Sequence, residues 1–226
     1  TIVRWIINLA PFGIMGLVFT NVVSNGLAIF TQYGKLLLLL VGTMLFMALV
    51  INPIIIFIYL RCNPYPLVFR CLRESGLTAF FTRSSAANIP VNMAMCEKLG
   101  MDKDFYSVSI PLGATINMDG TAIYQCVATI FLATCCGMTL TLGQMVTIVV
   151  TATLASIGTA GTPGAGMIML AMVLEAMNIP VDMIMIIYGV DRLFDMGRTC
   201  LNITGDVSCA LCVTKWENEK AAKAAK

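Results

Sequence analysis

The stretch Asp191-Arg-Leu-Phe-Asp195-Met-Gly-Arg198-Thr199-Cys-Leu-Asn202-Ile-Thr-Gly-Asp206 decides the fold, because it places charged side chains inside an apolar segment. At about 100° per residue, its polar members fall within an arc of roughly 80° on a helix, with Thr199 just off the edge. The members of this polar stripe are Asp191, Asp195, Arg198, Asn202 and Asp206. An ionised side chain costs about 2.5–3.5 kcal/mol at the centre of a membrane helix. Three carboxylates outnumber the arginine, so the stripe predicts that something positive binds there.

The rest of the chain is apolar enough for a membrane. Of 226 residues, 58% are hydrophobic and only 12% are charged, and the mean hydropathy is +0.87. Residues 5–34, 36–60 and 120–174 carry no charge, and a spanning helix needs only about 20 mostly apolar residues. A large soluble core would need charged helices to cover it. The composition therefore predicts an all-α integral membrane protein that lies in the lipid bilayer.

Two of the expected membrane segments are interrupted. The six expected segments lie at about 2–23, 36–60, 65–98, 105–134, 142–178 and 181–213. The third is interrupted by the small and polar run 82–90, and the fifth by the run 156–166. Each half is about 12–17 residues long, which is short for spanning. Paired interruptions are typical of transporter binding sites, so we expect two re-entrant helical hairpins. The alternative is a full span kinked at glycine.

Basic residues predict the orientation. Arg61, Arg70 and Arg73 lie between the second and third segments, and four lysines follow the last segment at 215, 220, 223 and 226. The positive-inside rule places both groups in the cytoplasm. The C-terminus is then cytoplasmic, and residues 214–226 form a solvated, frayed tail. The loop 97–104 is cytoplasmic if the third segment re-enters, and outside if it spans.

The fourth segment contains a break at Asn117-Met118-Asp119-Gly120. These residues disfavour a continuous helix, and an unwound break leaves carbonyl oxygens available as ligands. Oxygen ligands suit a hard cation such as Na⁺. The chain has no histidine and nine scattered cysteines, which gives no pattern for zinc. A satisfied polar kink is the alternative interpretation.

The charges also suggest a substrate with both signs. Hairpin tips direct backbone N–H groups and helix N-termini at an anionic group, such as the α-carboxylate of an amino acid. Asp195 would accept the ammonium group. Arg198 suits bidentate capture of a second carboxylate, or it pairs with Asp191 or Asp195. No basic cluster alternates with aromatic residues, so the sequence gives no indication of nucleic-acid binding.

Four motifs in order resemble the dicarboxylate/amino acid:cation symporter family, which has the glutamate transporter fold. They are Arg83-Ser84-Ser85, Asn117-Met118-Asp119-Gly120-Thr121, Ser156-Ile-Gly-Thr159-Ala-Gly161-Thr-Pro163-Gly, and Asp195-Met-Gly-Arg198-Thr199 with Asn202 and Gly205-Asp206. The resemblance implies a non-enzymatic transporter of the plasma (inner) membrane that forms a homotrimer when complete. It also implies a scaffold-type transmembrane helix at 1–33, a transport domain at 34–213 with hairpins at about 65–98 and 142–178, and the absence of the N-terminal half of the fold.

The resemblance implies the roles of individual residues. The substrate site would be formed by Arg83, Ser84, Ser85, Thr121, Thr162, Gly166, Asp195, Arg198, Thr199 and Asn202. One sodium site would be formed by Gly113, Asn117, Asn202 and Asp206. A second would use carbonyls near Thr115, Met118, Ser156, Ile157 and Thr159, and a third would use Asp119 with Asn117.

The two halves of the chain suggest different substrates. The runs 71–76 and 82–92 resemble bacterial sodium/serine-threonine symporters, a branch that lacks the arginine at 198 and the Asp-Gly-Thr at 119–121. Gly205-Asp206 resembles the sodium-coupled branch. We expect sodium-coupled symport of acidic amino acids or dicarboxylates such as aspartate or glutamate, because a neutral side chain would leave the buried Arg198 unpaired. Symport of serine and threonine is the alternative. An intramembrane aspartyl protease is a remote one, because Ile203-Thr-Gly-Asp206 lacks the first glycine of the Gly-x-Gly-Asp signature.

Overall fold

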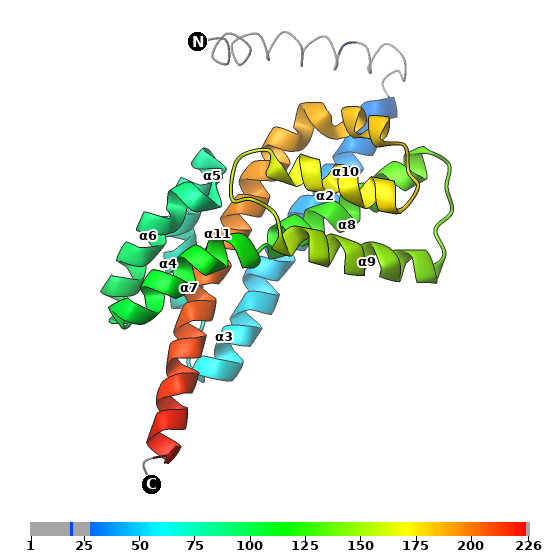
Figure 1. Ribbon diagram of the computed structural model, residues 1–226. Coiled ribbons are helices and arrows are strands. Elements are labelled where there is room, and N and C mark those ends of the chain that lie inside the picture. The colour runs from blue at the N-terminus through cyan, green and yellow to red at the C-terminus, as the bar shows by residue number, and fades with distance from the viewer. Residues whose placement is uncertain (1–18, 20–27, 225–226) are drawn as a thin grey trace.

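The computed structural model describes Phe19 and residues 28–224, with side chains described at Phe19 and at 33–220. The segment expected at 2–23 therefore lies outside the described residues apart from Phe19. The described residues form helices and connections without any strand, as Figure 1 shows. This confirms the predicted all-α class. The helices are α2 (Ala28–Phe46), α3 (Asn52–Leu60), α4 (Tyr65–Cys71), α5 (Leu77–Thr82), α6 (Ser85–Lys98), α7 (Lys103–Ile116), α8 (Asp119–Cys135), α9 (Leu142–Ile157), α10 (Ala165–Ala176) and α11 (Ile184–Ala224).

The first described helices form one long apolar unit. The π-helical turn Met47–Ile51 joins α2 to α3, and 33–60 is long and apolar enough to cross a membrane, with a mean hydropathy of 2.4 over its best window. The described part of this unit begins at Ala28, so residues 33 and 34 both lie within α2. Leu38 is 78% exposed and Ile58 is 61% exposed. An exposed apolar surface of this kind suits contact with lipid rather than water.

Each interrupted segment consists of two helices. A π-helical turn, Leu72–Gly76, joins α4 to α5. The chain then turns at Arg83 in the left-handed conformation (φ 54°) and starts α6, whose N-cap Ser84 accepts a hydrogen bond from Ala87 N. Residues 158–164 connect α9 to α10 and end at Gly164, where a φ of 81° favours glycine. The helices of each pair contact one another.

The chain is also interrupted between α7 and α8. The first helix ends at Ile116 and the second begins at Asp119, so Asn117 and Met118 lie between them outside any helix. These two residues face the middle of α11, as the hydrogen bonds described below establish.

The last helix is the centre of the structure (Figure 1). It contacts α2 through α8 and α10. It continues to Ala224, so the frayed tail expected from residue 214 is wrong for 214–224. Two contacts stabilise the first turn of this extension: Lys215 Nζ donates to Leu60 O at the end of α3, and it lies 4.0 Å from Glu219 one turn later. A cation at a helix C-terminus is favourable because the helix dipole is negative there.

The charged stripe of α11 is buried inside this apolar shell. Asp191, Asp195, Arg198 and Asp206 are each less than a tenth exposed. Burial of this kind is tolerated only when the charges are paired or coordinate an ion. The fold therefore encloses the polar stripe of α11 in the interior of the protein, where its charged side chains can bind an ion or a substrate.

Candidate functional site

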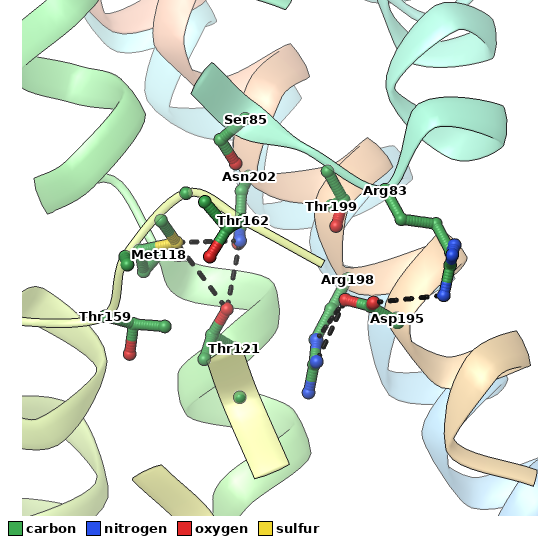
Figure 2. A pocket seen from close by; sticks show the side chains of 13 residues that line it. Arg83, Ser85, Met118, Thr121, Thr159, Thr162, Asp195, Arg198, Thr199 and Asn202 are labelled. Atoms are coloured by element: carbon green, nitrogen blue, oxygen red, sulfur yellow. Dashed lines mark hydrogen bonds and ion pairs between the residues drawn. The ribbon is translucent and has the colours of Figure 1, made fainter. Parts of the chain in front are cut away.

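A small cavity lies where the middle of α11 meets the 83–85 turn, the 158–164 connection and the start of α8 (Figure 2). It has an empty volume of about 230 Å³. Its lining contains every residue predicted for the substrate site except Ser84, together with Met118, Thr159, Ala160 and Gly161. The cavity therefore gathers residues that are more than a hundred positions apart in the sequence.

The two interrupted segments touch each other at this cavity. Ala86 N donates to Gly161 O at 3.0 Å, and Ser84 Oγ donates to the same oxygen at 2.8 Å. Gly161 permits this approach, because a Cβ there would lie 3.0 Å from Ala86 N and 3.2 Å from Ala114 O. Ser84 thus holds the two connections together and does not line the cavity.

Charged side chains form one wall of the cavity. Arg198 Nε and Nη2 lie 3.0 and 2.9 Å from Asp195 Oδ1, and Nη1 lies 3.8 Å from Asp191 Oδ1. The guanidinium also stacks over the ring of Tyr124, with 4.5 Å from Cζ to the ring centroid. Figure 2 shows that Arg83 approaches Asp195 from the other side, at 3.7 Å. Asp195 is therefore shared by two arginines, whereas Nη1 and Nη2 of Arg198 are buried without a hydrogen-bond partner among the described residues.

On the opposite side of the cavity, Asn202 forms hydrogen bonds to the residues around the 117–121 interruption. Its Nδ2 donates to Thr121 Oγ1 at 3.0 Å and to Met118 Sδ at 3.1 Å (Figure 2). Its Oδ1 accepts from Gly120 N at 2.8 Å. Its backbone carbonyl accepts from Asn117 Nδ2 at 2.9 Å. One buried amide therefore holds the 117–121 interruption against α11.

Comparison with known proteins supports the family that these motifs indicate. The sequence pattern of the sodium:dicarboxylate symporter family matches residues 1–216. The chain belongs to the sodium:dicarboxylate symporter family. This membership confirms the resemblance, and the family and the relatives that match are transporters rather than enzymes.

Similar proteins carry the name serine/threonine transporter SstT. The protein from Bifidobacterium adolescentis is 55% identical over 213 residues, which cover 92% of this chain and 50% of the relative. The protein from Streptococcus agalactiae is 51% identical over 210 residues (91% and 52%), and that from Streptococcus thermophilus is 49% identical over 210 residues (91% and 52%). The chain thus spans about half the length of the curated relatives it matches.

The residues predicted for the first sodium site of this symporter family lie together below the cavity. A Cβ at Gly113 would lie 2.0 Å from Asp206 Oδ1, and a Cβ at Gly205 would lie 2.6 Å from Asn117 Nδ2. Asp206 is 4% exposed, and its Oδ2 has no hydrogen-bond partner among the described residues. A buried carboxylate oxygen without a partner is costly unless a cation visits it. The donor set of carboxylate, amide and carbonyl oxygens suits a hard cation.

The residues whose carbonyls are predicted for the second sodium site differ in exposure. Met118 and Thr159 line the cavity and Ser156 is buried, whereas Thr115 and Ile157 are exposed. In the third set, Asp119 Oδ1 accepts from Gly120 N at 3.0 Å, which is a local contact at the start of α8. No group of three or more Cys, Asp or Glu side chains in the described chain is arranged to hold a metal.

Sequence reasoning missed Tyr124. Its side chain is fully buried, and its ring lies against the guanidinium of Arg198. The available signal was its spacing, because Tyr124 lies three residues after Thr121 and residues at that spacing share a helix face. Ala160 and Gly161 were also missed as lining residues, although they lie in the small-residue run that predicted the interruption.

Proposed function

We propose that the chain forms the substrate-carrying half of a sodium-coupled symporter for small neutral amino acids such as serine and threonine. The relatives named serine/threonine transporters support this alternative better than the acidic substrates that we expected. Because the chain spans about half of those relatives, the activity belongs to the complete protein.

The position of Arg198 is the observation that carries this choice. The expectation of an acidic substrate assumed that a neutral substrate would leave Arg198 unpaired. Arg198 instead makes two contacts of about 3 Å with Asp195 and lies near Asp191. A neutral side chain leaves the ion pair with Asp195 in place. An acidic side chain would instead contact Nη1 and Nη2, which have no hydrogen-bond partner among the described residues.

Both charged groups of an amino acid have partners at the cavity. We assign the ammonium group to Asp195, whose Oδ2 faces Gly164 N and Arg83. The carboxylate would bind at the start of α6 near Ser85 and on the 160–162 connection, since helix N-termini and turn N–H groups favour anions. We assign the substrate hydroxyl to Thr199, which lines the cavity, because Thr121 Oγ1 already accepts from Asn202 Nδ2.

Sodium would supply the positive charge that the lower part of the stripe lacks. Asp206 is buried with an unpaired oxygen, and Gly113, Asn117 and Asn202 would complete its site. Asn117 and Asn202 also hold the 117–121 interruption that forms part of the cavity. Ion binding and substrate binding therefore share the same residues, which is the physical requirement for coupling.

The membrane arrangement is part of the proposal. We infer that α4–α6 and α9–α10 are re-entrant hairpins, that the 117–118 interruption is an unwound break at mid-membrane, and that the C-terminus is cytoplasmic. The 34–213 region would move as a transport domain, and the complete protein would form a homotrimer through its scaffold.

Uptake by the gene product in liposomes tests this function. An inward sodium gradient should drive accumulation of labelled serine, and replacement of sodium by choline should abolish it. Unlabelled threonine should compete, whereas aspartate at the same concentration should not. Serine uptake that is equal in choline would contradict the coupling, and stronger competition by aspartate would restore the acidic alternative.

A further inference from the structure

Gly166, the second residue of α10, lies directly against Arg198 in the cavity. A Cβ at Gly166 would lie 2.0 Å from Nη1, 2.3 Å from Cζ and 2.7 Å from Nη2 of that arginine. Ordinary contact begins near 3.4 Å. A side chain at 166 would therefore displace the guanidinium by about 1.4 Å, the difference between 3.4 and 2.0 Å.

The guanidinium cannot absorb this displacement in its present position. Asp195 holds it at 2.9 Å, Asp191 lies at 3.8 Å, and the Tyr124 ring covers one of its faces at 4.5 Å. Arg198 is 2% exposed. An arginine on the surface could move aside. The guanidinium of Arg198 is instead enclosed by these three side chains, and Gly166 lies against it as well.

Backbone conformation does not explain a glycine at this position. The described glycines with a positive φ are Gly100, Gly137 and Gly164, and Gly166 is not among them. Glycine is a poorer helix former than alanine. The missing Cβ is therefore the property of Gly166 that the structure uses.

We propose that Gly166 is a specificity-determining positioning residue. By leaving space for the guanidinium, it keeps Arg198 paired with Asp195 and beside Asp191, so that the cavity accepts a neutral side chain. This inference rests on the proposed function. A side chain at 166 releases the guanidinium from its carboxylates and leaves it available to an acidic substrate.

Thermal unfolding without substrate tests the packing relationship independently of transport. The four proteins are the unmodified one, Gly166→Ala, Arg198→Cys and the double variant. Gly166→Ala should lower the unfolding temperature by about 4–8 °C when Arg198 is present. It should leave that temperature unchanged or raise it in the Arg198→Cys background, where the space is free. If Gly166→Ala lowers the unfolding temperature equally with Arg198 and with Arg198→Cys, Gly166 does not position Arg198.

Binding titrations test the effect on specificity. Gly166→Ala should weaken serine binding about tenfold, because the displaced guanidinium lines the cavity that holds the substrate. It should reduce the preference for serine over aspartate at least tenfold. Gly143→Ala is the matched control, since a Cβ there meets nothing within 4 Å. An unchanged serine-to-aspartate ratio would overturn the specificity role.

The two hypotheses fail in different ways. If the unmodified protein shows no sodium-dependent serine binding, the proposed function fails, and with it the serine preference assigned to Gly166. The unfolding cycle still decides whether Gly166 positions Arg198. If the unmodified protein binds serine with sodium and the cycle shows no coupling, only the role of Gly166 is wrong.

Discussion

The guanidinium of Arg198 lies 2.9 Å from the carboxylate of Asp195, one turn earlier on the same face of α11. With Asp191 at 3.8 Å from Arg198 and Arg83 at 3.7 Å from Asp195, the charges around the cavity form a balanced set of two acids and two arginines. Asp206 further along the helix has no ion pair within the described chain. The stripe thus has a neutralised half at the substrate cavity and an acidic half, which we assign to sodium.

Removal of Arg198 should destabilise the protein even without substrate. Arg198→Cys leaves Asp195 and Asp191 buried without their main partner, and breaking a buried ion pair costs about 3–5 kcal/mol. Thermal unfolding in detergent measures the loss. Arg192→Cys is the control, because Arg192 lies on the exposed face of the same helix. Similar unfolding temperatures for the two variants would contradict the pairing.

Neutralisation of Asp206 should weaken the response to sodium. Asp206→Asn keeps the size of the side chain but removes the charge that we assign to the cation. We expect the sodium concentration for half-maximal serine binding to rise at least tenfold, which corresponds to about 1.4 kcal/mol. Asp182→Asn, at an exposed aspartate before α11, should leave it unchanged. An unaltered sodium titration in Asp206→Asn would remove this residue from the proposed site.

Loss of the Ser84 hydroxyl should loosen the contact between the two connections. Ser84→Ala removes the hydrogen bond to Gly161 O and the N-cap of α6. Loss of an N-cap alone costs about 1 kcal/mol. We expect a lower unfolding temperature and faster proteolysis near residue 161. Ser107→Ala is the matched control, since its hydroxyl bonds only within α7. Identical behaviour of both variants would show that the contact is not formed in the membrane.

Labelling of the 97–104 loop tests the membrane arrangement. If α4–α6 re-enters, this loop lies on the same side as the C-terminal residues. A cysteine introduced by Lys103→Cys, in a variant with the exposed native cysteines replaced, should react with an impermeant reagent only from the cytoplasmic side. Reaction from the outer side would mean that 65–98 spans the membrane.

Much of the fold followed from the sequence because its signals were local. The charge-free runs predicted the apolar helices, and the small-residue runs predicted the interruptions at 83–84 and 158–164. The extension of α11 to Ala224 was not predictable, because it depends on the contact of Lys215 with Leu60 O, which are 155 residues apart. The described part of α2 begins at Ala28, before the start expected at 36, so Gly34 and Lys35 did not interrupt the helix.

The site was predictable in its residues but not in its pairing. Helical spacing placed Asp191, Asp195 and Arg198 on one face, yet it left open whether Arg198 binds substrate or its neighbours. Which of these Arg198 does depends on its rotamer and on the contacts with Tyr124 and Gly166 that enclose it. These two residues come from different helices. The expectation of an acidic substrate depended on this unresolved choice.

Calorimetric titration of the gene product with serine and with aspartate, each in sodium and in choline, tests the central claim most directly. We predict heat of binding for serine in sodium only, and binding of aspartate at least tenfold weaker. Tighter binding of aspartate would show that Arg198 leaves Asp195 to meet an acidic substrate. Serine binding of equal strength in choline would show that the acidic half of the stripe does not couple sodium to the substrate.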